Sequence, residues 1–409
     1  MTDSVPAAAP PRKRFLVLLV ALSATGPVAL NIFVPAIPQL TTRFNTDAAT
    51  VQLTLSLFLL SLASGQLLLG PLSDRFGRRP VVLGGIALAC LASFAAMAAP
   101  SIEWLIAARV AQALGAGTGI VISRAIVRDL YDRDRAAAML GLVTSAMVIA
   151  PMVAPMIGGL LDTVFGWESI FLAVSIVTLI VLIWSVVALP ETNPLRASGT
   201  DSSAVSWREW HALLTNRRFY RYALTSTFGT APYYVLIGGA PHVVVNIIGA
   251  TSAEYGVWFT LSSLGYMIGN FIASRLSTRY GVHTMIKAGI GLGLIATTTA
   301  VILLATVGTQ IWIFFVPQLF VSVGNGLLLP NSIAAAISVR PQAAGAASGI
   351  SGFLQMSTGA AIAQGISYIL VHDGGALSVP LMMIGVLSVA LMFYYGLGGR
   401  DAEINGRSA

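Results

Sequence analysis

Charge is scarce in this chain. Asp, Glu, Lys and Arg together make up 10% of its 409 residues, whereas hydrophobic residues make up 56%. Soluble domains of ordinary composition carry about 25% charged residues. The mean hydropathy is +0.82. This balance excludes an ordinary soluble domain and predicts a polytopic membrane protein.

Cysteine is almost absent, because Cys90 is the only one and lies within an apolar run. A single thiol excludes a disulfide framework and a thiolate metal site, and we expect neither a metal nor a cofactor. The net charge of +7 could indicate a nucleic-acid partner, but the basic residues are spread over short turns. They do not form one patch with exposed aromatics, so we expect anionic lipid headgroups and no nucleic acid as their partner.

Long apolar runs are abundant by contrast. A membrane crossing needs about 20 apolar residues, and twelve such runs occur, at 15–38, 50–72, 80–99, 102–125, 137–161, 168–190, 220–245, 254–276, 285–307, 310–333, 343–370 and 376–397. The first run follows a basic PRKR segment but has no suitable cleavage site, so we interpret it as an uncleaved span. The predicted fold class is therefore all-α, with twelve transmembrane helices.

The basic residues favour one side of this topology. With the N-terminus inside, 21 of the 23 Lys and Arg residues fall in cytoplasmic segments, and only Arg43 and Arg109 do not. Positive charge concentrates on the cytoplasmic side of membrane proteins. We therefore predict a multi-pass membrane protein with both termini in the cytoplasm.

One long polar stretch divides the spans six and six. We predict an N-terminal tail, two six-helix bundles joined by a cytoplasmic linker, and a C-terminal tail, at 1–14, 15–190, 191–218, 219–397 and 398–409. We expect the protein to be a monomer.

The two halves share a motif. SDRFG at 73–77 recurs as STRYG at 277–281, and with this offset Gly65 aligns with Gly269. A duplication at half the chain length is typical of transporters whose site lies between two pseudo-symmetric bundles. The second copy has Thr278 where the first has Asp74, so the halves are not equivalent.

The first copy lies in a charged turn, GQLLLGPLSDRFGRRPVVLGG at 65–85. Gly65 and Gly70 are expected to allow close helix packing, and Pro71 to end the second helix. Gly77 and Pro80 would then turn the chain back. Asp74, the only acid among three arginines, is expected to form an ion pair or a helix-end contact.

This turn resembles the signature loop of the major facilitator superfamily, which is taken to latch the two halves in the outward-facing state. The matching residues are Gly65, Gly70, Pro71, Asp74, Arg75, Gly77, Arg78 and Arg79. The resemblance implies that Asp74 forms a contact that breaks and re-forms as the halves rock.

Residues 109–129 resemble the fourth helix of that family. Arg109 is the only basic residue placed well inside a span, and a cation there indicates a substrate or coupling site. The alternative is that Arg109 extends to the outer surface. Gln112, one turn further along, shares its face.

The fifth span resembles the antiporter helix of the family, in which small residues precede a proline and a pair of glycines. The corresponding positions are Gly141, Ala150, Ala154, Pro155, Gly158 and Gly159, with Ala in place of Gly at two of them. The resemblance implies an exporter.

The end of the first span, NIFVPAIP at 31–38, and SRAIVRDLY at 123–131 resemble the bicyclomycin and chloramphenicol resistance branch of proton-coupled drug exporters. Many members of that branch have an Asp in the first helix. This chain has Asn31, which can form hydrogen bonds but cannot bind a proton.

No carboxylate remains near the bilayer midplane, because ten of the 16 acids fall in cytoplasmic segments and six at or near outer ends. Proton coupling then runs through an acid nearer an end, such as Glu254 or Asp129, through His242, or not at all.

Polar and aromatic residues inside the spans of the second half are candidates for the substrate cavity, beside Asn31, Arg109 and Gln112 of the first. They are Tyr233, Tyr234, Tyr266, Asn270, Asn325, Asn331, Gln355 and Gln364. Aromatic rings beside few hydrogen-bonding groups suit a bulky amphipathic ligand.

These features, together with the resemblance, predict an exporter of small amphipathic compounds in the bacterial inner membrane that works by alternating access and proton antiport. The alternative is an uncoupled or differently coupled facilitator or exporter of a polar metabolite. We do not expect an enzyme, because the sequence places no nucleophile with a base and no metal-ligand cluster inside the bilayer. We also do not expect a receptor, which would usually have an output domain at longer termini.

Overall fold

A computed structural model describes residues 13–131, 139, 143, 152–193, 207–340, 343–372 and 375–397. Within these ranges the secondary structure is helical and includes no strand. Eight of the described helices are long and apolar enough to cross a membrane. Three further long helices, α10, α11 and α14, carry more polar residues and lie where the sequence predicts spans.

The helices of the first half begin with α1 (Lys13–Asn31), the 3₁₀ turn η1 (Val34–Ala36) and α2 (Ile37–Arg43). They continue with α3 (Ala48–Phe76), α4 (Arg78–Met97), α5 (Ile102–Leu130), the helix Met152–Phe165 and α7 (Glu168–Ala188). The short helix α9 (Trp207–Leu214) precedes the second half. That half consists of α10 (Arg217–His242), the π turn η2 (Val243–Ile247), α11 (Ser252–Tyr280), α12 (Val282–Thr306), α13 (Ile311–Ser338), α14 (Ala344–His372) and α15 (Ser378–Gly396).

Short polar side chains begin several of the long helices. The Asp47 carboxylate accepts a hydrogen bond from the Thr50 amide at 2.8 Å, and the Asn216 side chain accepts from the first turn of α10. Thr251 and Glu254 form a capping box at the start of α11. These contacts satisfy amides that have no partner within the helix.

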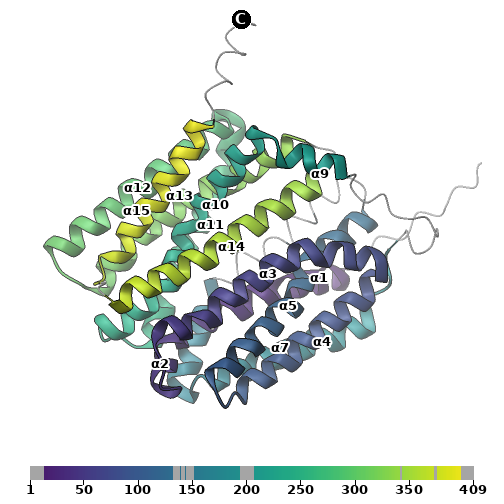
Figure 1. Ribbon diagram of the computed structural model, residues 1–409, viewed down its shortest axis with the longest axis horizontal. Coiled ribbons are helices and arrows are strands. Elements are labelled where there is room, and N and C mark those ends of the chain that lie inside the picture. Colours follow the sequence, from purple (N-terminus) through teal and green to yellow (C-terminus); the bar gives the residue numbers. More distant parts are fainter. Residues whose placement is uncertain are drawn as a thin grey trace, which may run out of the picture.

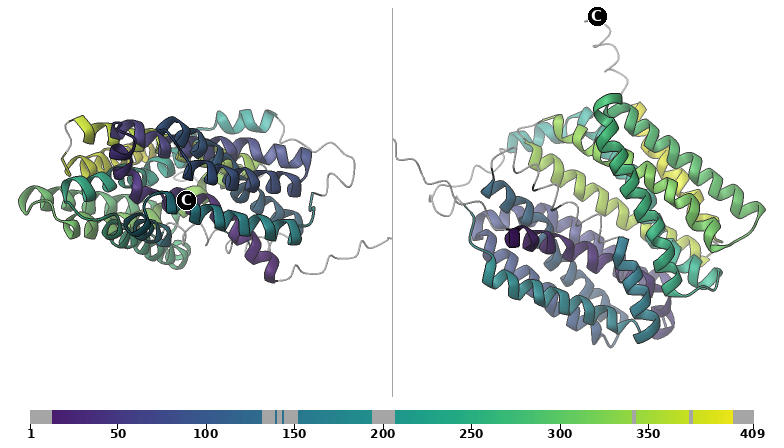
Figure 2. Two further views of the ribbon diagram at one scale, coloured as in Figure 1. Left: turned by 90° about the horizontal axis from the view of Figure 1, so that it is seen from below. Right: turned by 180° about the vertical axis from the view of Figure 1, so that it is seen from behind.

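The helices form two bundles, which Figure 1 colours from purple to blue and from teal to yellow. Within each bundle the helices run up and down beside one another, and Figure 2 shows the same two groups from below and from behind. Helices α3 and α14 lie side by side where the bundles meet. The expected fold of two pseudo-symmetric helix bundles is confirmed.

The two ends of this assembly differ. We call the end that carries the turns at Gly77 and Gly281 the basic end, because Arg75, Arg78 and Arg79 lie there. The opposite end, with the loops that precede α3 and α11, is the far end. The charge bias predicts that the basic end faces the cytoplasm.

A shared hydrophobic core joins the bundles toward the far end. Phe33 and Phe58 of the first half and Tyr255, Phe259 and Phe315 of the second are all buried and belong to one cluster. Burying aromatic side chains stabilises such contacts by area and by ring geometry.

The expectation that α3 ends at Pro71 is wrong. The helix continues through this proline to Phe76, and Gly77, with φ of 99°, ends it. Proline is tolerated within membrane helices where neighbouring groups satisfy the freed carbonyl. The close packing expected at Gly70 is also wrong, because a Cβ atom there would meet no other atom within 4 Å.

Candidate functional site

A cavity of about 650 Å³ lies between the bundles. Its lining comes from α1, α3 and α5 of the first half and from α10, α11, α13 and α14 of the second. It extends from Asn31 and Phe259 toward Arg124, Ile337 and Ser348 near the basic end. Its volume is in the range of cavities that hold drug-sized ligands.

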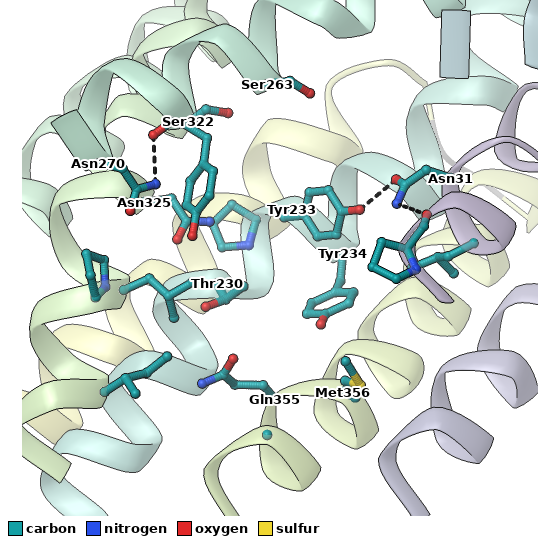
Figure 3. Close-up of a pocket in the computed structure, with 18 of the residues that line it drawn as sticks. Asn31, Thr230, Tyr233, Tyr234, Ser263, Asn270, Ser322, Asn325, Gln355 and Met356 are labelled. Atoms are coloured by element: carbon teal, nitrogen blue, oxygen red, sulfur yellow. Dashed lines mark hydrogen bonds between the residues drawn. The ribbon is translucent and has the colours of Figure 1, made fainter. Parts of the chain in front are cut away.

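A hydrogen bond between the two bundles lies in the lining of this cavity. The Tyr233 hydroxyl donates to Asn31 Oδ1 at 2.7 Å, and Asn31 Nδ2 donates to the Pro27 carbonyl at 2.9 Å, as Figure 3 shows. The Tyr234 ring stands edge-on to that of Tyr233, with centroids 5.3 Å apart. Asn31 therefore positions an aromatic pair of the second bundle.

Most of the candidate cavity residues are brought together. The described lining includes Asn31, Tyr233, Tyr234, Tyr266, Asn270, Asn325 and Gln355. Asn331 and Gln364 lie outside it. The Asn331 amide donates to the Leu327 carbonyl within its own helix, whereas Gln364 accepts from Ser56 and donates to the Ala49 carbonyl across the bundles.

Several lining residues could not be singled out from the sequence. They are the hydroxyl and amide residues Gln66, Thr230, Ser262, Ser263, Gln318, Ser322, Ser348 and Ser351, together with Arg124. Arg124 is the one charged residue in the described lining, and it comes from the inner part of the predicted fourth span. Serine and threonine occur on every face of these helices, so their type alone carries no signal.

Arg109 lies behind the cavity rather than in its lining, and it is fully buried. Its guanidinium stands over the rings of Phe58 and Phe33, at 4.0 and 4.6 Å from their centroids. Nη1 donates to the Ala29 carbonyl at 2.9 Å and to Gln112 Oε1 at 2.5 Å. The side chain does not extend to a surface. Its hydrogen bond to Ala29 joins α5 to α1, and its cation–π contact with Phe58 joins α5 to α3.

Comparisons with known proteins agree with this architecture. The family model of the Major Facilitator Superfamily matches residues 16–245 and again residues 223–406. The chain belongs to the major facilitator superfamily. It is 30% identical to Multidrug resistance protein D of Escherichia coli, over 91% of this chain and 93% of that protein. It is 25% identical to the bicyclomycin resistance protein homolog of Haemophilus influenzae, over 96% and 98% of the two chains.

Solved structures show the same fold at low identity. A bacterial homolog of the human lysosomal transporter Spinster, in an inward-facing and unoccupied conformation, has a TM-score of 0.75 and 14% identity, with 98% of this chain and 99% of that chain covered. The relatives with resistance names confirm the resemblance to the drug-exporter branch of the superfamily.

The superfamily's signature loop forms a network of charges around Arg78 at the basic end. Nη1 of Arg78 lies 2.5 Å from Asp74 Oδ1, and Nε donates to Asp129 Oδ2 at 2.9 Å. Nη1 also donates to the Ser73 hydroxyl at 2.6 Å. Arg78 is 7% exposed, so its charge is balanced by two carboxylates inside the first bundle.

A carboxylate from the segment after α7 completes this network. Glu191 accepts hydrogen bonds from the Arg78 and Arg79 amides, at 2.9 and 3.2 Å, where α4 begins. Partial burial opposes its ionisation, but these amides and those of Thr192 and Asn193 donate to it, so the pKa of Glu191 is lowered overall. A carboxylate at a helix N-terminus is also favoured by the helix dipole.

The glycine pair of the fifth predicted span, Gly158 and Gly159, packs closely at the far end. A Cβ atom on Gly158 would collide with the Ile32 carbonyl, and one on Gly159 with the Ser252 carbonyl of the other bundle. A Cβ atom on Gly256 of the second bundle would likewise collide with the Pro155 carbonyl. Ala154 is buried, whereas Gly141 and Ala150 lie outside the described residues.

Asp129, Glu254 and His242 are the residues that the sequence suggests for proton coupling. The two acids already have structural partners, and His242 lies at the end of a helix. Asp129 pairs with Arg78, and Glu254 belongs to the capping box of α11. His242 ends α10 and is half-buried. None of the three lines the described cavity.

Proposed function

We propose that this major facilitator transporter exports small amphipathic compounds across the bacterial inner membrane by alternating access. The observation that carries the proposal is a drug-sized cavity whose lining is shared by both bundles. A site between two bundles can open to either side when the bundles rock about it.

Contacts toward the far end support a state in which that side is closed. Ser252 donates to the Pro35 carbonyl at 3.1 Å, and Gln364 donates to the Ala49 carbonyl at 2.8 Å. Each of these hydrogen bonds joins one bundle to the other. The cavity lining, in contrast, continues to Arg124 and Ser348 toward the basic end.

The charge of the lining supports neutral or anionic amphipathic compounds over lipophilic cations. No acidic residue occurs in the described lining, whereas Arg124 contributes a positive charge. A cation in a low-dielectric cavity needs a nearby counter-charge. The three tyrosines and the amide side chains offer ring surface and hydrogen bonds to a neutral ligand.

Proton antiport remains our proposal for the energy source, with both termini in the cytoplasm and the protein as a monomer. The alternative, an uncoupled or differently coupled carrier of a polar metabolite, is favoured by one observation. Asn31 occupies the position of the usual first-helix acid, and the described lining has no carboxylate. A protonophore separates these two mechanisms, because it abolishes efflux only if a proton gradient drives it.

Drug accumulation in cells tests the export function. We expect cells that express the chain to accumulate less of a neutral amphipathic drug, and Tyr234→Ala to reduce the efflux rate about tenfold, since a lost aromatic contact costs about 1.5 kcal/mol. Tyr368→Ala is the matched control, because Tyr368 lies on α14 but is 56% exposed. Equal accumulation with and without the chain, for neutral, anionic and cationic probes alike, contradicts the proposal.

A further inference from the structure

Asp162 is a buried carboxyl group to which the proposed export cycle assigns no role. It lies near the end of the helix Met152–Phe165, one turn beyond Gly158 and Gly159, and is 3% exposed. Its Oδ2 accepts a hydrogen bond from Gln39 Nε2 of α2 at 2.7 Å. In the described part of the chain, Oδ1 has no hydrogen-bond partner.

The carboxyl of Asp162 lies at a contact between the two bundles, which we call the seam; Gln39 and Gly159 of the first bundle and Ser252 of the second form it. Gln39 Nε2 also lies 3.5 Å from the Ser252 hydroxyl, and Ser252 begins α11 of the second bundle. The Ser252 carbonyl packs directly on Gly159. Separation of the bundles at the far end would therefore take Ser252 away and admit water to Asp162.

Among the residues that the structure describes, no cation forms a salt bridge with Asp162. The two salt bridges among the described residues both involve Arg78 at the basic end. Arg43 on α2 is exposed and is in neither of them, while Glu254 on α11 is held in its capping box. Among the described residues, burial is the main cause that raises the pKa of Asp162, the negative charge of Glu168 on α7 raises it further, and a hydrogen bond with the Ser252 side chain opposes the rise.

We propose that Asp162 is a proton-binding site that couples closure of the far end to protonation from that side of the membrane. In the closed seam the carboxyl is buried and its hydrogen-bond partners, Gln39 and Ser252, are neutral, an environment that favours its protonated form. In the open state it is hydrated and releases the proton to the far side. By linkage, acid on that side favours closure.

This role differs from that of a proton carrier across the membrane. The proton enters and leaves on the far side, so Asp162 sets the balance between open and closed states without moving charge through the protein. The carboxyl has different pKa values in the open and closed states. Between these two pH values, the binding of one proton per closure changes the ratio of closed to open molecules by up to tenfold per pH unit. The inference depends on rocking of the bundles and not on any particular substrate.

Distance measurements between spin labels test this proposal directly. Labels at Thr42→Cys and Gly375→Cys, on exposed far-end positions of the two bundles, report opening in lipid nanodiscs without substrate. The native Cys90 is buried and is replaced by Ser. We expect the population with the long distance to rise several-fold as the pH is raised from 5 to 8.

Asp162→Asn retains the shape and a hydrogen-bond acceptor for Gln39, and mimics the protonated acid. We expect this variant to stay closed at both pH values. Glu103→Gln is the matched control, since Glu103 is an exposed acid at the start of α5, and it should open with pH like the wild type. A pH-independent wild type, or an Asp162→Asn variant with the full pH response, would overturn the proposal.

These outcomes are independent of export. A chain that opens with pH but moves no drug supports the proton site and contradicts the proposed function. A chain that exports drug but does not open with pH supports the proposed function and contradicts the proton site. If Asp162→Asn does not fold, the pH dependence of opening in the wild type and in Asp162→Glu tests the proposal instead. Asp162→Glu retains a carboxyl group, so its opening should still depend on pH.

Discussion

The two bundles turn the chain at the basic end with the same backbone and different side chains. Helix α3 ends at Gly77 and α11 at Gly281, with φ values of 99° and 81°. Each glycine amide donates to a serine carbonyl four residues earlier, Ser73 or Ser277, at 3.0 Å. Glycine adopts this left-handed conformation at little cost, so the backbone of the repeated motif is the same in both halves.

The side chains around the two turns are held by different interactions. In the first turn, Arg78 joins Asp74 and Asp129. In the second, Val282 and Thr278 occupy the places of Arg78 and Asp74, so this pair of charges has no counterpart in the motif.

Aromatic contacts stabilise the second bundle near its turn instead. Arg221 of α10 donates from Nε to the Tyr394 carbonyl at 2.9 Å, and its guanidinium stands 4.7 Å from the centroid of the Tyr394 ring. The Tyr394 hydroxyl lies 2.9 Å from Nδ1 of His283 on α12. Three helices of one bundle are joined in this way.

This difference indicates a division of roles. A close ion pair depends on short distances and defined directions, so a small shift of a helix can break it and expose two carboxylates. A cation is attracted to an aromatic ring anywhere within about 6 Å of its centroid, which is a looser distance requirement than that of a close ion pair. We therefore expect the first turn to change between transport states and the second to remain a fixed part of its bundle.

The largest effect is expected from Arg78→Ala. Removing this cation leaves Asp129, which is 13% exposed, without its partner, and we expect a loss of stability of about 2 kcal/mol, below the range for fully buried pairs. Thermal unfolding in detergent measures it, and efflux should fall to background. Val282→Ala at the equivalent position should cost less than about 1 kcal/mol. Equal losses for the two variants would remove the distinction between the turns.

A smaller effect is expected from Arg221→Ala in the second bundle. The variant loses the cation–π contacts with Tyr394 and Tyr222 and one hydrogen bond to a carbonyl, together about 1.5 kcal/mol. Arg279→Ala is the control, because Arg279 is exposed beside Tyr280, and it should leave the unfolding temperature nearly unchanged. We expect efflux per folded Arg221→Ala molecule to remain close to that of the wild type. Loss of efflux without loss of stability would instead make this cluster part of the moving machinery.

The sequence predicted the elements of this comparison better than their contacts. The repeated motif located both turns, and the helical spacing of Arg109 and Gln112 correctly placed the two side chains on one face. Pro71 failed as a helix end because the membrane helix tolerates it and Gly77 provides the left-handed residue that ends α3.

Contacts between the bundles could not be predicted, because they depend on how two separate helix groups dock. Arg109 was the expected charge of the site, yet Arg124 lines the cavity and Arg109 lies behind it. Asp162 could be placed near an outer end, but its hydrogen bond with Gln39, which also contacts Ser252, joins residues that are distant in the sequence. Helical periodicity describes the faces of one helix and carries no information on the partner of each face.

The smallest effect on stability, and the sharpest test of the first turn, is expected from Asp74→Asn. The Asp74 side chain is 39% exposed, and a pair of that exposure contributes about 0.5 kcal/mol. The thermal unfolding temperature should therefore hardly change. If the first turn switches between states, the efflux rate should still fall several-fold, because Arg78 loses one of the two carboxylates that bind it. Arg275→Gln, the matched control, removes an exposed charge at the same end of the second bundle, where it stacks on Phe271, and should leave efflux unaltered. Wild-type efflux by Asp74→Asn would contradict the latch. If stability and efflux fell in parallel, the Asp74–Arg78 pair would be a structural contact only, like those of the second bundle.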